Sequence, residues 1–200
     1  MKRIGILGGT FDPVHYGHLS IGRTAAEALS LSAIYLMPAA RSPFKQDQET
    51  TPAEDRLAML RLAAEEDSIF QISTIELYKT KVSYTYQTMV EWKAEYPDEE
   101  LVFICGADAI LSIEKWYRYQ ALLDICSLAV AQRPGSDHQA VDRMMEKLEV
   151  EEHATLYRLS APLLPLSSSE IRERIRAGQP IEDLVPPEVE RYIHVHGLYL

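Results

Sequence analysis

The sequence has little cysteine, no long apolar run and fewer basic than acidic residues. Its two cysteines, Cys105 and Cys126, both lie in apolar stretches, which indicates reduced thiols in the core rather than a disulfide bridge. Because there are two cysteines and no signal peptide, we expect a cytoplasmic protein. No apolar stretch approaches the ~20 residues that a membrane span requires, so we expect no membrane partner.

The shortage of basic residues limits the class of ligand. Lys and Arg total 20 against 30 Asp and Glu, which gives a formal charge of −10. A protein that binds a nucleic-acid polymer normally carries a basic stripe, and this composition argues against one. A small phosphorylated ligand needs only a few local cations and backbone N–H groups. The composition therefore favours a small ligand, and it makes no prediction of oligomeric state.

Short apolar runs alternate with segments of helical length along the chain. The sequence predicts strands at 3–8, 33–37, 69–77, 101–105, 127–132 and 155–159. It predicts helices at 18–29, 52–66, 88–95, 136–149, 169–176 and 187–196. This alternation is typical of an α/β, Rossmann-like, doubly wound fold with a mainly parallel sheet and helices on both faces. No linker or repeat interrupts it, so residues 1–200 are predicted to form a single domain.

Two of the predicted helices carry start signals. Thr51 is expected to cap a helix that has Pro52 at its first position and Glu54 in its first turn. Farther along, Ser167, Ser168 and Ser169 precede a helix, where serines cap the free N–H groups and the N–H groups can face a phosphate. Arg172 lies one turn inside that helix. It is either a second phosphate ligand or a solvated surface charge.

Three of the predicted strands end in turns that suit a ligand. These turns are Gly8-Gly9, Gly106-Ala107-Asp108 and Arg133-Pro134. In a parallel sheet, ligands bind beyond the carboxyl ends of the strands, so we expect the three turns to share one edge. Asp108 accepts hydrogen bonds from ribose hydroxyls or caps the next helix, and the two roles can coexist. Arg133 either reaches a nucleotide phosphate or stays a surface charge.

The stretch GGTFDPVHYGH, residues 8–18, is the most informative in the chain. Gly8 and Gly9 let the backbone approach a ligand, and Thr10 adds a hydroxyl and another N–H group. His15 and His18 then lie beside the positive end of a helix, where their ring N–H groups can bind phosphate oxygens. A plain tight turn and a zinc site are the alternatives, but no third zinc ligand lies nearby. The position between a strand and a helix favours phosphate binding.

This stretch matches the His-x-Gly-His signature of the nucleotidyltransferases that are related to class I aminoacyl-tRNA synthetases. The chain as a whole resembles the bacterial nicotinate-nucleotide adenylyltransferases, almost from end to end. The other stretches that carry the resemblance are LMPAARSPFK (36–45), SYTYQTM (83–89), FICGADAILSIEKWY (103–117), QRPG (132–135), LSSSEIR (166–172) and VPPEVERYIHVHGLY (185–199).

The resemblance implies adenylyl transfer from ATP to nicotinate mononucleotide, which gives deamido-NAD and pyrophosphate. It implies the catalytic residues His15, His18, Lys45 and Arg172. It implies an ATP site formed by Gly8, Gly9, Thr10, Phe11, Gly106, Asp108, Ser167, Ser168 and Ser169, and it places Thr85, Trp116 and Arg133 at the acceptor. A C-terminal helical segment, about 167–200, is expected to complete the nucleotide site. Mg²⁺ is expected to arrive with ATP, because no carboxylate cluster in the sequence looks like a dedicated metal site.

One departure from the family keeps alternatives open. The family usually has Pro-Pro-His-Lys where this chain has Ser42-Pro43-Phe44-Lys45, and Phe44 can neither donate a hydrogen bond nor carry charge. Nicotinamide mononucleotide or phosphopantetheine could be the acceptor of the same chemistry. A module that binds ATP without turnover is a further alternative. Trp116 either stacks on the pyridine ring or packs in the core.

Overall fold

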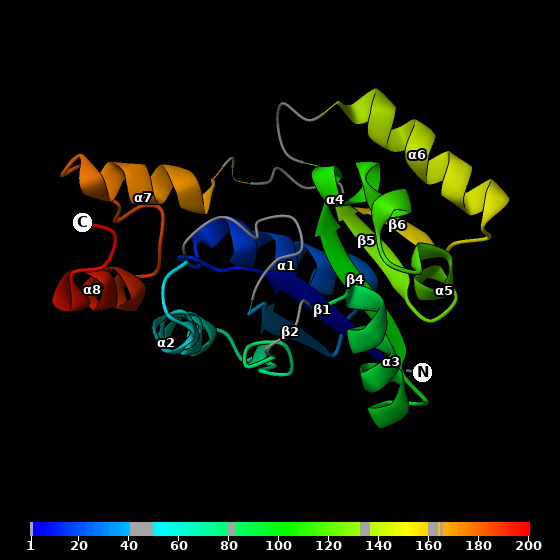
Figure 1. Ribbon diagram of the computed structural model, residues 1–200, viewed down its shortest axis with the longest axis horizontal. Helices are drawn as coiled ribbons and strands as arrows, with labels where there is room; N and C mark the ends of the chain where they lie inside the picture. Colours follow the sequence, from blue (N-terminus) through cyan, green and yellow to red (C-terminus); the bar gives the residue numbers. More distant parts are fainter. Residues whose placement is uncertain (1, 41–49, 80–82, 133–136, 160–163, 165) are drawn as a thin grey trace.

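The computed structural model describes residues 2–40, 50–79, 83–132, 137–159, 164 and 166–200 (Figure 1). Its sheet has the order β3-β2-β1-β4-β5-β6, and every neighbouring pair is parallel. The strands are β1 (Arg3–Gly9), β2 (Ala33–Pro38), β3 (Phe70–Ile72), β4 (Glu100–Gly106), β5 (Ser127–Ala131) and β6 (Leu156–Leu159). This is the doubly wound order of a Rossmann-like fold, so the predicted fold class is confirmed.

Helices cover both faces of the sheet (Figure 1). One face packs against α1 (Tyr16–Leu29), α2 (Ala53–Ala64), α7 (Ser168–Arg176) and α8 (Pro187–His196). The other packs against α3 (Thr85–Glu95), α4 (Ala107–Leu111), the 3₁₀ turn η1 (Ile113–Lys115), α5 (Tyr119–Leu123) and α6 (His138–Glu151). The strands supply both cores by alternation: in β4, Val102 and Ile104 face the first core, whereas Leu101 and Phe103 face the second. No helix in the described part of the chain is long and apolar enough to cross a membrane.

Two boundaries differ from the prediction in ways that affect the site. Strand β3 ends at Ile72 rather than at residue 77, and the chain then turns, with Leu77 N–H bonded to the Thr74 carbonyl at 3.0 Å. Beyond the end of β3, the buried Glu76 carboxyl accepts a 2.5 Å hydrogen bond from the Thr88 hydroxyl of α3. Helix α3 begins at Thr85 instead of 88, which makes Thr85 its first residue.

The predicted cap of α2 is wrong. Pro52 occupies the N-cap position and makes no side-chain cap. The backbone of Thr51 is used elsewhere, because its N–H donates to Asp12 Oδ2 at 3.2 Å and its carbonyl accepts from Arg56 Nε at 3.0 Å. The hydrogen bond to Asp12, a tertiary contact, is therefore made in place of the predicted local cap.

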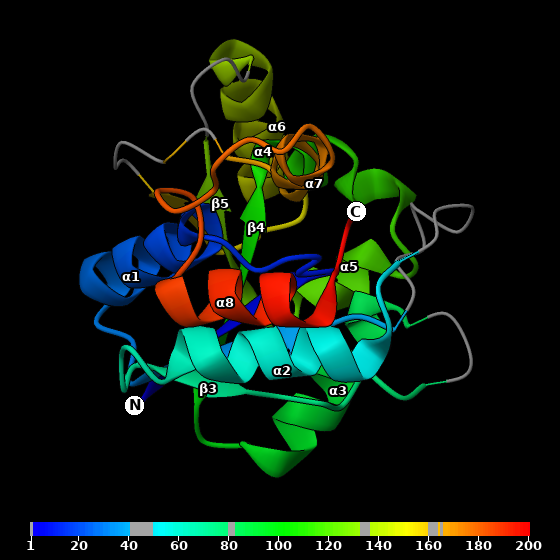
Figure 2. The same cartoon turned by 90° about the vertical axis from the view of Figure 1, so that its left-hand side faces the viewer.

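The C-terminal helices agree closely with the prediction. Helix α7 starts after Ser167, whose hydroxyl accepts the Glu170 N–H at 3.2 Å. Helix α8 spans Pro187–His196, and Gly197 follows it with a left-handed φ of 58°. Helix α8 lies alongside α2, as Figure 2 shows, and the two helices are in contact. The last residues of the chain therefore return to the neighbourhood of the β1 turn.

Arg56 of α2 is a buried charge that joins three segments. Its side chain is 2% exposed, and its guanidinium donates to the carbonyls of Thr10 at 2.7 Å, Ala39 at 2.9 Å and Thr51 at 3.0 Å. Burial lowers the pKa of Arg56, while the neighbouring Asp12 carboxylate opposes that change. Arg56 therefore holds the turn after β1, the end of β2 and the approach to α2 together.

Arg56→Met should destabilise the protein by about 3 kcal/mol or more, because it leaves three carbonyls without a donor in a buried site. Arg61→Met is the matched control on the exposed side of the same helix, and it should change the free energy of unfolding by less than about 0.5 kcal/mol. Urea unfolding of both variants measures the difference. Equal stabilities would show that the Arg56 hydrogen bonds contribute nothing net.

Candidate active site

The carboxyl ends of β1 and β4 lie side by side at the switch point of the sheet. Leu7 pairs with Ile104, and the chain leaves β1 for α1 on one face and β4 for α4 on the other. Gly8-Gly9 and Gly106 therefore share one edge, as the sequence predicted, and this is where doubly wound sheets bind ligands. Ala131, at the end of β5, pairs with Gly106, whereas Arg133 lies outside the described residues.

The turn after β1 brings the two histidines together. Their rings stack with centroids 3.7 Å apart, and His15 is only 1% exposed. The His15 backbone N–H donates to His18 Nδ1 at 3.3 Å, so the neutral His18 ring carries its proton on Nε2. Phe11, with a φ of 51°, packs its ring 4.8 Å from that of His18. The turn thus presents an N–H donor of fixed tautomer at the start of α1.

Gly17 is required by the histidine pair. A Cβ atom on Gly17 would lie 2.9 Å from the His15 ring and 3.3 Å from Leu166 Cβ. Both distances are shorter than ordinary packing allows, and the His15 ring is buried. The glycine of His-x-Gly-His is therefore needed for space, a reason that the sequence did not reveal.

Helix α7 docks onto the same turn. The Ser168 hydroxyl donates to the Pro13 carbonyl at 3.0 Å. Arg172 Nη1 donates to the Asp12 carbonyl at 2.8 Å, and its Nη2 donates to Ser169 Oγ at 3.3 Å. The structure therefore brings the serine segment and Arg172 to the histidine turn, across more than 150 residues of sequence.

Lys45 and Phe44 lie outside the described residues. Ala39 and Thr51, which lie close to the two ends of the segment 41–49, are described, and Arg56 binds the carbonyls of both. Ala39 also donates its N–H to the Gly9 carbonyl at 3.0 Å. Both ends of the segment that contains Lys45 are thus anchored beside the histidine turn.

The two predicted acceptor residues lie on segments that contact each other. Tyr84, which precedes Thr85, packs its ring 4.9 Å from that of Tyr117, which follows Trp116. The Trp116 ring is half-buried and meets Phe103 edge-on at 6.0 Å, while the Phe103 ring lies 3.4 Å from where a Cβ of Gly8 would be. Phe103 therefore connects the Trp116 loop to the turn after β1.

Asp108 lies at the same edge with its side chain exposed in the first turn of α4. The N-cap of α4 is Gly106, so the alternative that Asp108 caps this helix is wrong. A Cβ at Gly106 would meet no atom within 4 Å, so the space in front of it is open. A ligand can approach the backbone here with Asp108 beside it.

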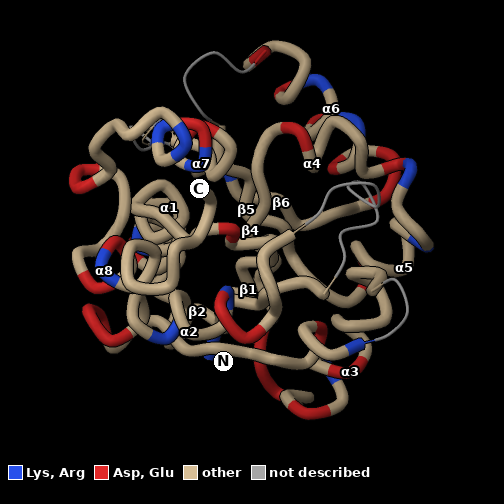
Figure 3. Tube along the Cα trace, turned by 60° about the vertical axis from the view of Figure 1, so that its left-hand side comes forward, with Lys and Arg blue, Asp and Glu red and all other residues tan. Residues whose placement is uncertain are grey.

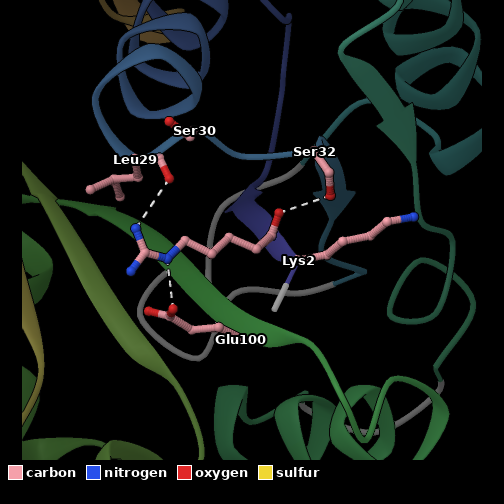
Figure 4. A pocket seen from close by; sticks show the side chains of 6 residues that line it. Lys2, Leu29, Ser30, Ser32 and Glu100 are labelled. Atoms are coloured by element: carbon pink, nitrogen blue, oxygen red, sulfur yellow. Dashed lines mark hydrogen bonds and ion pairs between the residues drawn. The ribbon is translucent and has the colours of Figure 1, made fainter.

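A pocket of about 490 Å³ lies at the opposite edge of the sheet, around the amino ends of β1 and β4 (Figure 4). Arg3 is held there between Glu100, at 2.6 Å, and the Leu29 carbonyl, at 3.3 Å, so its charge is neutralised within the pocket wall.

Among the described residues, no group of three or more His, Cys, Asp or Glu side chains could hold a metal ion. Cys105 and Cys126 are free and buried, as predicted, and burial raises the pKa of each to about 12.

Sequence reasoning missed two residues that organise this edge, Arg56 and Tyr199. Tyr199 donates its hydroxyl to Asp12 Oδ1 at 2.7 Å, and no local pattern could indicate a contact across 187 residues. Arg56 did carry a signal, because it falls at helical spacing from Leu60 and Ala63 on the buried face of α2. A charge on an apolar helix face indicates a buried partner.

A model of the cytidylyltransferase-like family matches residues 6–174. Together with the sheet order and the turn at its switch point, this match defines a nucleotidyltransferase of that class.

Relatives narrow the class further. The chain is 42% identical over 199 residues to a Geobacillus kaustophilus protein described as "Probable nicotinate-nucleotide adenylyltransferase", covering 100% of this chain and 87% of that protein. A Thermoanaerobacter protein with the same description is 38% identical over 198 residues, covering 98% and 94%. The Plasmodium falciparum nicotinic acid mononucleotide adenylyltransferase complexed with NaAD has the same fold, with a TM-score of 0.81, 21% identity and coverage of 100% and 98%. The chain belongs to the nicotinate-nucleotide adenylyltransferase family, which confirms the resemblance read from its motifs.

Gly17→Ala should displace the His15 ring, and with it the His18 ring that stacks on it. Overpacking a buried site typically costs about 1–3 kcal/mol, of which the better helix propensity of alanine returns less than about 1 kcal/mol. Gly106→Ala is the control, since the added methyl enters open space, and it should leave stability within about 0.5 kcal/mol. Thermal melting of the two variants compares them. Unchanged melting of Gly17→Ala would mean that the His15 ring is free to move.

Proposed function

We propose that this protein transfers the adenylyl group of ATP to nicotinate mononucleotide, forming deamido-NAD and pyrophosphate. The observation that carries the proposal is the 2.8 Å hydrogen bond from Arg172 to the Asp12 carbonyl. It joins a guanidinium and a serine-capped helix start to the histidine turn, and each of these groups is suited to phosphate oxygens.

The reaction is a direct displacement at the α-phosphorus of ATP. An oxygen of the acceptor's 5′-phosphate forms the new bond to this phosphorus, the bond from the phosphorus to the β-phosphate bridging oxygen breaks, and pyrophosphate leaves with the electron pair. The acceptor is itself the nucleophile, so no side-chain nucleophile is needed. The protein's task is alignment and charge stabilisation.

The residue roles follow from this mechanism. We assign to His18 Nε2–H, His15, Lys45 and Arg172 the binding of phosphate oxygens as charge moves to the leaving pyrophosphate. Gly8, Gly9, Thr10 and Phe11 would bring backbone to the nucleotide, and the segment Ser167–Ser169 would present its N–H groups to the phosphates. Gly106 gives the adenosine an open approach, and the exposed Asp108 carboxylate can accept hydrogen bonds from ribose hydroxyls.

Mg²⁺ enters this proposal as part of the MgATP substrate. The described residues offer no group of three or more candidate ligands, and the Asp12 carboxylate already accepts hydrogen bonds from Thr51 and Tyr199. The phosphate oxygens and water would therefore supply most of the ligands. When bound, the ion neutralises phosphate charge.

The acceptor side rests on Thr85, Trp116 and Arg133. Thr85 stands at the start of α3 with a hydroxyl that can donate to the nicotinate carboxylate, and the half-buried Trp116 ring offers a stacking face. We further propose that residues 1–200 act as one unit in which 167–200 completes the nucleotide site. A cytoplasmic location is supported by the two free thiols.

Pyrophosphate release from ATP tests the function when nicotinate mononucleotide, nicotinamide mononucleotide and phosphopantetheine are offered separately. We expect release with the first acceptor and deamido-NAD as its product. Release with phosphopantetheine alone would reject the acceptor but keep the chemistry. ATP binding without release in any arm would favour the ATP-sensing module instead.

His18→Asn should lower turnover roughly a hundredfold and leave the fold intact. The asparagine oxygen can replace Nδ1 as acceptor of the His15 N–H, but the Nε2–H donor is lost, and one charge-stabilising donor typically accounts for this factor. Steady-state rates and thermal melting are measured on the same preparation. Loss of cooperative melting would make the role of His18 structural, and full activity would remove it from the mechanism.

The wild-type enzyme should prefer nicotinate over nicotinamide mononucleotide by at least about a hundredfold in kcat/KM, because an amide NH₂ would oppose donors placed for a carboxylate. Thr85→Val should narrow this preference. Thr88→Val, the same substitution one turn along α3, removes the donor to buried Glu76, so it should lower stability without changing the preference. A preference that both variants retain would exclude Thr85 from acceptor selection.

A further inference from the structure

The C-terminal tail of the chain ends against the histidine turn. After α8, Gly197 and Tyr199 both have left-handed φ values, 58° and 67°, and the Leu198 N–H returns to the Ile193 carbonyl at 3.0 Å. This reversal carries the Tyr199 ring to the core beneath the turn, where its hydroxyl donates to Asp12 Oδ1 at 2.7 Å.

Asp12 is the point at which distant segments meet. It is 5% exposed, and its second carboxylate oxygen accepts the Thr51 N–H at 3.2 Å. Its backbone carbonyl accepts Arg172 Nη1 at 2.8 Å. A shift of the Asp12 backbone would move the carbonyl that accepts the Arg172 hydrogen bond, and the two hydrogen bonds to its carboxylate, one of them from Tyr199, hold the residue in place.

The Tyr199 hydroxyl is suited to act as a permanent donor. Burial, and then the neighbouring Asp12 carboxylate, raise the pKa of Tyr199 well above its ordinary value. The phenol therefore stays protonated at neutral pH. Two further contacts hold the backbone on either side of Phe11-Asp12, from Arg56 to the Thr10 carbonyl and from Ser168 to the Pro13 carbonyl.

We propose that Tyr199 is a positioning residue for adenylyl transfer: its hydroxyl fixes Asp12 and thereby the direction in which Arg172 presents its guanidinium to the phosphates. This inference rests on the proposed role of Arg172. Tyr199 itself touches no substrate in this scheme.

The chain supplies a matched control in Tyr192. Its hydroxyl donates to Asp55 Oδ1 at 2.8 Å, so Tyr192→Phe and Tyr199→Phe each remove one tyrosine–aspartate hydrogen bond that involves the C-terminal segment. Asp55 belongs to α2 and not to the turn. A purely structural role predicts the same kinetic result for the two variants.

Tyr199→Phe should lower kcat roughly tenfold, the loss that one hydrogen bond to a charged group typically causes, with a smaller change in the KM for ATP. Tyr192→Phe should stay within about twofold of wild type. In an Arg172→Ala background, Tyr199→Phe should cost less than about threefold, because the group it positions is gone. Equal kinetic losses in the two tyrosine variants, or an undiminished tenfold effect without Arg172, would overturn the inference.

A second measurement, of ATP affinity, distinguishes a failure of this inference from a failure of the proposed function. If wild-type protein released no pyrophosphate with any acceptor, the proposed function would fail, and calorimetric ATP affinity would still compare the two tyrosine variants. Weaker ATP binding by Tyr199→Phe than by Tyr192→Phe would support the inference in that case, and equal affinities would reject it.

Discussion

The buried guanidinium of Arg56 is the interaction on which the ligand-binding edge of this protein depends. A parallel sheet ends in loops whose carbonyls need donors, and here the carbonyls are those of Thr10, after β1, and of Ala39 and Thr51, near the two ends of the β2–α2 connection. One planar group with five N–H donors can satisfy all three at once, which a lysine ammonium could not do with the same geometry. The cost of burying the charge is offset by these three hydrogen bonds and by the nearby Asp12 carboxylate.

In the proposed mechanism, the site works through groups that this arrangement holds in fixed positions, and no side chain acts as a nucleophile. The histidine turn, the start of α7 and the Tyr84–Tyr117 contact come from segments far apart in the chain, and the switch point of the sheet brings them to one edge. A displacement between two phosphates needs exact alignment of groups that the substrates already carry. In the proposed mechanism, rigid packing of the turn, with Gly17 giving space to the His15 ring, keeps the histidines in the positions that this alignment needs.

Most of the fold could be predicted because local rules and tertiary packing agree along most of the chain. Apolar runs gave β1, β2, β4 and β5, and the Pro187 and Gly197 signals bounded α8 to the residue. Prediction failed where a contact outside the local pattern is made: the Thr51 N–H donates to Asp12, and Glu76, expected in a strand, accepts a hydrogen bond from Thr88 of α3. That the histidines, the serines and Arg172 come together could be predicted from their motifs. Tyr199 could not, because its role exists only through a contact formed on folding.

The overall charge of −10 and a polyphosphate substrate are compatible for a physical reason. Charged residues lie mainly on the helices and connecting loops (Figure 3), and salt screens exposed charges beyond about 8 Å at physiological ionic strength. Groups within a few ångströms of the phosphates then decide binding, and in the proposed mechanism these are the Arg172 guanidinium, the His18 N–H and the starts of α1 and α7. The positive potential of these few groups is too local to attract an extended polyanion, but it is strong enough to bind one nucleotide. Composition could therefore argue against a polymeric partner without locating the site, which only the turn and its distant partners define.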